Sequence, residues 1–266
     1  MSNVSSRPVL EVRDVSLSFG GVHALRGMSL SIAHGESAAL IGPNGSGKST
    51  LVNVITRMVD PDRGSVLIGG SDITREKPHR IASHGVARTF QHLRLVPELT
   101  LRENVAAATA VRGRGGPFDE LRAWFGARGS GNAAATKADS ALDLMEVPAG
   151  VRDQYPASVP FALQRQTEMA RAIVAGPRIA LFDEPAAGMN PAEVVMLLRL
   201  LRAIHSTGTA TLLIDHNIEF VMEAAKHVTV INRGEQIAAG TADEVRRDPA
   251  VIEAYLGAQR SGGAAS

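Results

Sequence analysis

Apolar residues along this chain follow two periods, and short unbroken apolar runs lie between them. Alternation of apolar and polar residues predicts strands at 9–19 and 28–32. Unbroken runs predict buried strands at 38–41, 179–182 and 211–214. Because the first two strands and another expected at 65–68 lie around the 38–41 strand rather than all after it, they predict a small antiparallel β-layer beside it. Further short strands are expected at 65–68, 86–90, 228–231 and 236–239.

Helical segments separate these strands. Residues 192–204 place four apolar side chains on one helical face, those of Val194, Leu197, Leu198 and Leu201. Other helices are expected at 51–58, 103–111, 133–145 and 160–175. Strands that alternate with helices predict a parallel α/β core, with an inserted α-helical subdomain at about 93–160. The Gly- and Arg-rich stretch 112–132 is interpreted as a solvated loop. The alternative is a partner surface formed by Arg112, Arg114, Arg122 and Arg128.

Length and composition fit one large globular domain or two intimately packed ones. The chain has 266 residues, of which 44% are hydrophobic and 21% charged, as in ordinary soluble proteins. A capping box at 241–244 opens a helical extension over 240–257. We expect the domain to span 8–257, and the ends at 1–7 and 258–266 to be disordered.

Charge and residue usage narrow the function classes. The net charge of +1 provides no global basic field of the kind that attracts nucleic acid. The absence of cysteine excludes disulfides and thiolate-bound metals. No apolar run approaches the ~20 residues that span a bilayer, and residues 1–8 lack the apolar stretch of a secretory signal. We therefore expect a cytoplasmic chain that reaches a membrane only through partners.

The clearest chemical motif is GPNGSGKST at 42–50, between the apolar run 38–41 and the helical run 51–58. It matches the phosphate-binding P-loop, G-x-x-x-x-G-K-[ST], in its strand–loop–helix context. The glycines let backbone N–H groups point at phosphate oxygens, Lys48 brings positive charge to the β- and γ-phosphates, and Ser49 is placed to ligate Mg²⁺. The expected nucleotide contacts are Gly42, Pro43, Asn44, Gly45, Ser46, Gly47, Lys48, Ser49 and Thr50.

A second motif follows the 179–182 strand, which ends in Asp183 and Glu184. This is the Walker B pattern, in which a buried strand delivers a carboxylate to the ligand-binding edge of the sheet. Asp183 would hold Mg²⁺, and Glu184 is the candidate general base that polarises the attacking water. His216 follows the next strand and is placed to reach the γ-phosphate; the alternative is an ordinary surface or capping histidine.

The order of these motifs resembles the ATP-binding subunit of ABC transporters, with a P-loop NTPase core. The resemblance implies that Gln91 is the Q-loop glutamine, which senses Mg²⁺ and the membrane partner. It implies that residues 187–190 are the D-loop at a dimer interface and that His216 is the H-loop histidine. Phe19 stands where the family places an aromatic ring that stacks on adenine; a strand core residue is the alternative.

A closer resemblance is to ATPase subunits of branched-chain amino acid importers. It rests on RTFQH at 88–92 and DEPAAGMNP at 183–191. It also rests on two stretches near the end of the chain, DP at 248–249 and VIEAYLG at 251–257. By this resemblance the catalytic set is Glu184, His216, Gln91 and Lys48, and the metal set is Ser49, Gln91 and Asp183. The implied cofactors are ATP and Mg²⁺. The implied partners are a second ATPase subunit, membrane permeases on whose cytoplasmic face the chain sits, and indirectly an extracytoplasmic binding protein.

The family's L-S-x-G-Q signature is altered at 159–163, which reads VPFAL. Pro160 replaces the serine and has no N–H, Ala162 replaces the glycine, and Leu163 replaces the glutamine. In the family this loop contacts the γ-phosphate bound by the other subunit. The chain's own P-loop, Glu184 and His216 are intact, which suggests a heterodimer with one competent and one degenerate site. The alternative is that backbone and helix-dipole contacts survive, and that a homodimer works.

We therefore expect an ATP-hydrolysing importer subunit for branched-chain or related amino acids. Two alternatives are a non-hydrolytic regulatory subunit, favoured by the altered signature, and the ATPase of a related importer or a lipopolysaccharide-type exporter. A soluble ABC ATPase acting on DNA or the ribosome is disfavoured, because no second ATPase half or coiled-coil insertion is visible.

Overall fold

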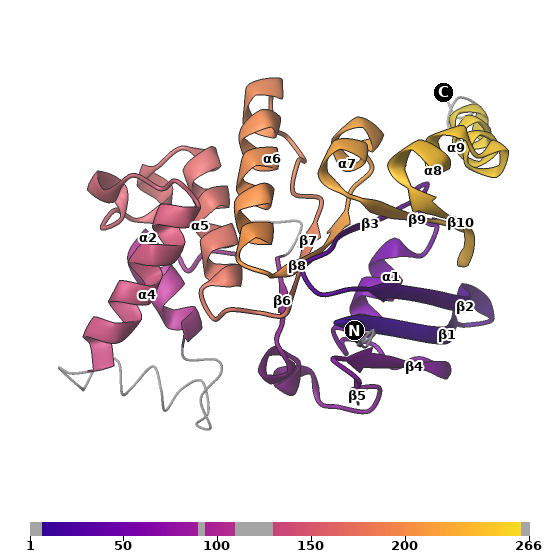
Figure 1. Ribbon diagram of the computed structural model, residues 1–266, viewed down its shortest axis with the longest axis horizontal. Coiled ribbons are helices and arrows are strands. Elements are labelled where there is room, and N and C mark those ends of the chain that lie inside the picture. Colours follow the sequence, from indigo (N-terminus) through magenta and orange to yellow (C-terminus); the bar gives the residue numbers. More distant parts are fainter. Residues whose placement is uncertain (1–6, 90–93, 110–129, 262–266) are drawn as a thin grey trace, which may run out of the picture.

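The computed structural model describes residues 7–89, 94–109 and 130–261, which build two sheets flanked by helices (Figure 1). One sheet is antiparallel, with the spatial order β2-β1-β4-β5. Its strands are β1 (Leu10–Phe19), β2 (Val22–Ile32), β4 (Arg63–Ile68) and β5 (Ser71–Asp72). Alternate residues of β1 are buried, as strand geometry requires of a sheet with one covered face. The predicted antiparallel β-layer is thus confirmed.

The second sheet has the order β10-β9-β3-β8-β7-β6 and is parallel except for the β9–β10 hairpin. Its strands are β3 (Ser37–Ile41), β6 (Val86–Arg88), β7 (Ile179–Asp183), β8 (Ala210–Ile214), β9 (His227–Asn232) and β10 (Glu235–Thr241). All residues of β3, β7 and β8 are buried, because both faces of this sheet are covered. The unbroken apolar runs predicted this arrangement.

Helices cover the parallel sheet and extend beyond it (Figure 1). They are α1 (Lys48–Ile55), α2 (Leu101–Ala107), α4 (Ser130–Leu144), α5 (Phe161–Ile173), α6 (Pro191–Ser206), α7 (Ile218–Ala224), α8 (Ala242–Arg247) and α9 (Pro249–Ser261). Short 3₁₀ helices lie at Pro78–His84, Ala149–Val151 and Pro156–Ser158. One core joins α1, the antiparallel sheet and one face of the parallel sheet; a second joins its other face to the remaining helices.

Several predicted boundaries differ from the observed ones. Strand β2 begins at Val22 rather than 28, and α1 spans Lys48–Ile55 rather than 51–58. The strand predicted to reach residue 90 ends at Arg88. Helix α9 runs to Ser261, so the backbone at 258–261 is helical where a disordered tail is predicted.

The helical layer also differs from the prediction in its extent. Helix α5 lies after the predicted end of the helical subdomain at 160, yet it packs against α2 and α4. Helix α2 ends at Ala107 where the sequence predicts residue 111. Most of the Gly- and Arg-rich stretch 112–132, including its four arginines, lies outside the described residues. The partner-surface interpretation of that stretch therefore stays a prediction.

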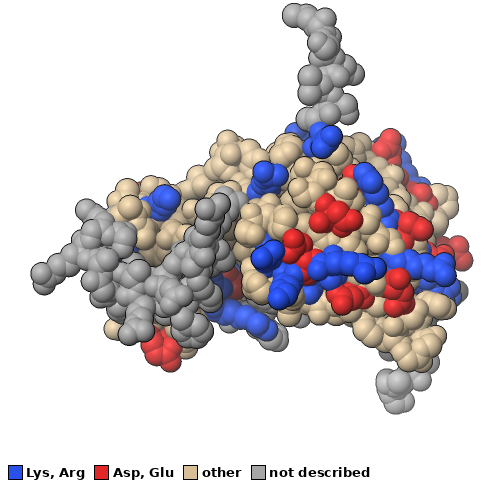
Figure 2. Space-filling model, turned by 90° about the horizontal axis from the view of Figure 1, so that it is seen from below, with Lys and Arg blue, Asp and Glu red and all other residues tan. Residues whose placement is uncertain are grey.

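Surface charge is mixed on the face seen from below (Figure 2), where lysine and arginine side chains alternate with aspartate and glutamate. Opposite charges placed close together leave little net field on such a surface. Among the described helices, none combines the length and the apolar character that a membrane crossing needs.

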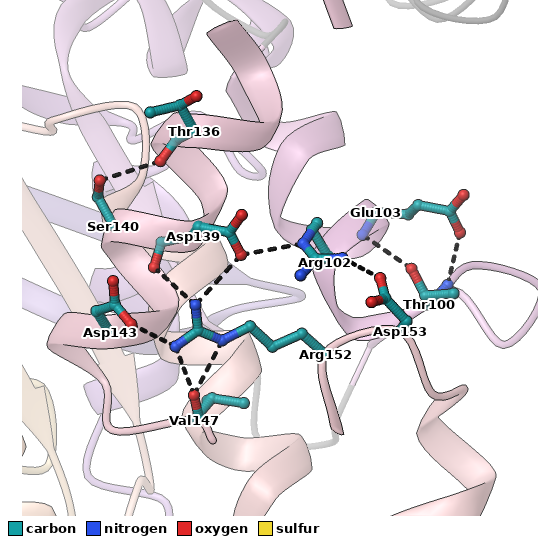
Figure 3. A network of polar contacts seen from close by, with 10 residues as sticks. All are labelled: Thr100, Arg102, Glu103, Thr136, Asp139, Ser140, Asp143, Val147, Arg152 and Asp153. Atoms are coloured by element: carbon teal, nitrogen blue, oxygen red, sulfur yellow. Dashed lines mark hydrogen bonds and ion pairs between the residues drawn. The ribbon is translucent and has the colours of Figure 1, made fainter. Parts of the chain in front are cut away.

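A polar network centred on Arg152 ties the helical subdomain together (Figure 3). The Arg152 side chain is only 7% exposed. Its Nε and Nη2 donate to the Val147 carbonyl at 3.0 and 2.7 Å, and its Nη1 donates to Asp139 at 3.2 Å. Asp139 also accepts from Arg102 of α2 at 3.0 Å. Burial acts to raise the pKa of Asp139, but hydrogen bonds from the two arginines lower it overall. The network thus joins α2, α4 and the turn that follows α4.

Replacing Arg152 with methionine is expected to lower the free energy of unfolding by about 1–3 kcal/mol, because the buried Val147 carbonyl loses both donors. Urea denaturation measures this change. The matched control is Arg13→Met, which removes an exposed arginine paired with Glu11 and should leave the midpoint unchanged. Equal midpoints for the two variants would mean that the network does not stabilise the fold.

Candidate functional site

The P-loop connects the end of β3 to the start of α1. Its backbone leaves no room for side chains at two of its glycines. A Cβ on Gly42 would lie 2.0 Å from the Ile231 carbonyl oxygen, and one on Gly47 would lie 2.6 Å from that of Ala24. Gly47 also has φ 111°, which side-chain-bearing residues rarely adopt. Tight packing against β2 and β9 therefore fixes the loop and directs α1, with its positive dipole end, toward any bound anion.

Lys48 is the first residue of α1 and is 8% exposed. Its Nζ donates to the carbonyl oxygens of Gly42 and Pro43 at 2.7 and 3.0 Å. Burial lowers the pKa of Lys48, while Glu184 and Asp183 act to raise it. A buried ammonium held by carbonyl oxygens is a strong site for phosphate. Burial takes water away from the ammonium, and a phosphate would supply the negative charge that stabilises it instead.

The Walker B carboxylates stand at the carboxyl end of β7. Asp183 is 9% exposed and pairs with Arg88 of β6, whose Nη2 donates to its Oδ2 at 3.1 Å. Glu184 adopts the left-handed region at φ 47°, and its N–H donates to the Ile214 carbonyl at 2.7 Å. That bond joins Glu184 to the end of β8, immediately before Asp215.

His216 lies beside Glu184, with 3.7 Å between His216 Nδ1 and Glu184 Oε1. The imidazole is 61% exposed, so it is accessible to a ligand above the sheet edge. Asp215 is 1% exposed and accepts from the N–H groups of Ala186 and Asn217 at 3.3 and 2.9 Å. Asp215 thus holds the segment after Glu184 and the start of α7 in fixed positions. Asp215 was not singled out from the sequence, although its place before His216 was a signal.

Three further predicted residues are Phe19, Gln91 and Asn190. Phe19 is 51% exposed at the tip of the β1–β2 hairpin, so its ring is available for stacking, and the strand-core alternative does not fit this exposure. Gln91 lies outside the described residues; two residues before it, the N–H of Thr89 donates to the Leu181 carbonyl at 2.9 Å. Asn190 caps α6 and accepts from the N–H groups of Ala192 and Glu193 at 3.0 and 3.1 Å. Adenine stacking by Phe19 stays a prediction.

The altered signature keeps the shape of a helix start. Pro160 is the N-cap of α5, and no side chain caps this end. The carbonyl of Pro160 accepts from Leu163 N at 3.0 Å, and Gln164 Nε2 donates back to the Val159 carbonyl at 3.1 Å. Phe161 is 50% exposed, and Leu163 packs against the core. The segment therefore has helix geometry without the side-chain donors that a phosphate would use.

Oxygen donors suited to Mg²⁺ lie at this edge of the sheets. The exposed Ser49 is the second residue of α1, and Asp183 is the last residue of β7. Mg²⁺ takes few protein ligands and fills its octahedron with water and substrate phosphates. The described residues contain no group of three or more His, Cys, Asp or Glu side chains able to hold an ion alone. The residues present fit a metal that arrives with a nucleotide.

Two hollows adjoin the site. One, of about 570 Å³, lies between the P-loop and α9 and is lined by polar groups of Asn44, Ser46, Asn232 and Glu253 among others. The second, of about 390 Å³, lies between β6 and the helices α2 and α5. Its walls are mostly apolar, and Glu168 and Arg171 stand among them. Burial raises the pKa of Glu168, although Arg165 and Arg171 act to lower it.

Comparison with known proteins gives consistent results across most of the chain. The family described as ABC transporter matches residues 25–187, and the family described as branched-chain amino acid ATP-binding cassette transporter matches residues 235–260. The chain is 36% identical to BraF of Pseudomonas aeruginosa, a high-affinity branched-chain amino acid transport ATP-binding protein, across 95% of this chain and 99% of BraF. It is 35% identical, with the same coverage, to LivG of Escherichia coli, which bears the same description.

Solved structures agree. An ATP-binding cassette of an ABC transporter in its ADP conformation superposes with a TM-score of 0.82 and 30% identity, covering 94% of this chain and 99% of the other. A nucleotide-free cassette gives a TM-score of 0.79 at 28% identity, covering 93% and 98%.

Proposed function

The chain belongs to the ABC transporter ATP-binding family, and from that premise we propose that it powers import of branched-chain or related amino acids through partner permeases. Similarity over 95% of the chain to importer subunits such as BraF carries this proposal. The match of residues 235–260 to the C-terminal family of amino acid cassettes supports it from a separate part of the sequence.

In the proposed reaction the P-loop binds the phosphates. Lys48 neutralises the β- and γ-phosphate charge, and the N–H groups of the loop and of α1 donate to phosphate oxygens. Ser49, Asp183 and Gln91 would hold Mg²⁺, which supplies positive charge to the phosphates when bound. Burial of Lys48 and Asp183 strengthens the interactions that they make.

Glu184 is the proposed general base. Its side chain is 25% exposed, and the bond from its N–H to the Ile214 carbonyl fixes its backbone. A carboxylate in this position would accept a proton from the attacking water as the water oxygen bonds to the γ-phosphorus, while the bond from that phosphorus to the β–γ bridging oxygen breaks and ADP leaves. In the proposed reaction His216, whose Nδ1 is 3.7 Å from Glu184 Oε1, donates to the γ-phosphate. The base thus comes from the residue that follows β7, and the histidine comes from the loop after β8.

Two kinds of partner are proposed. The apolar hollow between β6 and the helices α2 and α5 is the proposed docking site of a permease, because Val96, which lines it, is 43% exposed and Thr89, two residues before Gln91 in the sequence, lines it as well. A second ATPase subunit would close over the nucleotide, and the altered signature favours a different chain over a second copy. The chain would then sit at the cytoplasmic face of the membrane. An extracytoplasmic binding protein would deliver the amino acid to the permeases.

One alternative has an observation in its favour. The start of α5 offers no side-chain donor at the signature position, as expected of a regulatory subunit that binds ATP without hydrolysing it. Intact Asp183, Glu184 and His216 argue for hydrolysis instead. A related importer or a lipopolysaccharide-type exporter would use the same site for a different cargo.

Lys48→Ala in the organism's own gene is expected to abolish uptake of radiolabelled leucine, because the phosphates lose their buried counter-charge. Initial uptake rates measure the effect, with glucose uptake as the control for cell energy. Lys137→Ala, which removes a lysine of α4 in the helical subdomain, should leave both rates unchanged. Unimpaired leucine uptake in Lys48→Ala cells would refute the proposed cargo. The affinity of the purified chain for an ATP analogue would then show whether the proposed nucleotide site is correct.

A further inference from the structure

Arg88 opens the RTFQH stretch at 88–92, but the sequence alone assigns its side chain no role. It ends strand β6, and its side chain is 12% exposed. Its Nη2 donates to Asp183 Oδ2 at 3.1 Å, while its Nη1 donates to Asn53 Oδ1 at 2.8 Å and to Thr56 Oγ1 at 3.2 Å. Asn53 belongs to α1 and Thr56 is its C-cap. The guanidinium therefore joins the Walker B carboxylate to the helix that begins at Lys48.

Two cations and two carboxylates share this edge of the sheet. Arg88 and Lys48 are the cations, and Asp183 and Glu184 are the carboxylates. Lys48 and Asp183 are 8% and 9% exposed, and Lys48 interacts electrostatically with both carboxylates. Both carboxylates therefore compete with a phosphate for the same ammonium, and the competition is strong because Lys48 and Asp183 are buried.

We propose that Arg88 is a positioning residue that keeps Asp183 paired, so that Lys48 remains available for the phosphates of the nucleotide. Without the guanidinium, Asp183 would be a buried carboxylate with its charge uncompensated, and Lys48 would be a cation within its reach. The added negative charge would also repel phosphate directly. The effect is largest without Mg²⁺, because a bound metal ion brings its own positive charge. This inference rests on the proposed phosphate-binding role of Lys48.

The test is the affinity of the purified full-length chain for a fluorescent ATP analogue in EDTA. Arg88→Met is expected to weaken binding by ~10-fold or more. Arg88→Lys, which keeps the charge, should stay within about threefold of the unaltered chain. The double variant Arg88→Met/Asp183→Asn should also return to within about threefold, because the unpaired carboxylate is gone. A packing role would not be rescued in this way.

Control variants distinguish the possible outcomes of this test. Arg152→Met removes a similarly buried arginine outside the site and should leave the affinity unchanged. Lys48→Ala should weaken binding; if it does not, the proposed phosphate site itself is wrong. If Lys48→Ala weakens binding and Arg88→Met does not, only the role of Arg88 is refuted. A double variant as weak as Arg88→Met alone would also overturn it. Should Arg88→Met fail to fold, Arg88→Gln carries the same prediction, since it removes the charge but keeps a donor.

Discussion

Glu184→Gln is expected to lower ATP turnover by ~10²–10⁴-fold, the usual contribution of a general base. The glutamine keeps the size of the side chain and the backbone bond to Ile214, but it cannot accept the proton of the attacking water. ATP binding should persist, because Lys48 and the P-loop are untouched. Phosphate release measures turnover, and the fluorescent analogue measures binding.

Glu146→Gln is the matched control for that variant. Glu146 also has a left-handed backbone, with φ 57°, and pairs with Arg199 on the surface rather than with the nucleotide site. Its replacement should leave turnover within about twofold, since isolated surface pairs contribute little. If Glu184→Gln turned over ATP as fast as Glu146→Gln, Glu184 would not be the base.

The second large effect is a gain of function at the signature. The triple variant Pro160→Ser, Ala162→Gly, Leu163→Gln is expected to raise turnover of the chain on its own by at least ~10-fold. It restores a hydroxyl, an amide and backbone freedom at the start of α5, where no side chain now donates. One charge-assisted hydrogen bond to phosphate is worth ~1.5–3 kcal/mol, and ~1.4 kcal/mol is tenfold in rate.

Leu163 complicates that variant, because it packs against the core as well as occupying the signature. Leu163→Gln alone is therefore the control for stability. Thermal unfolding measures the stability of each variant. A triple variant that folds normally and shows no gain, alone or with a second subunit, would mean that the altered signature is not limiting.

Much of the nucleotide edge could be predicted from the sequence because its signals are local. The run 38–41 followed by GPNGSGKST specifies a strand, a loop and a helix within a few residues, and the structure has all three. The run 179–182 places Asp183 at a strand end in the same way. In both cases the burial pattern and the chemistry come from neighbouring residues.

Features that could not be predicted from the sequence depend on residues far apart in the chain or on an interrupted hydrophobic pattern. The β1–β2 pairing has three register shifts, which interrupt the alternation that would have revealed the first half of β2. Helix α7 has seven residues and buries only Phe220 and Val221, too few for a helical period. The Arg88–Asp183 pair joins residues 95 positions apart. No local pattern encodes such a pair, although the place of Arg88 three residues before Gln91 was a hint.

The most direct test of an ATP site completed by another subunit is turnover by the purified chain, alone and with a co-expressed partner ATPase. Glu184→Gln serves as the blank in both conditions. Turnover that appears only with the partner and vanishes in Glu184→Gln is the result we predict. Comparable turnover by the chain alone would show that VPFAL functions as a signature, and the asymmetric arrangement would have to be abandoned.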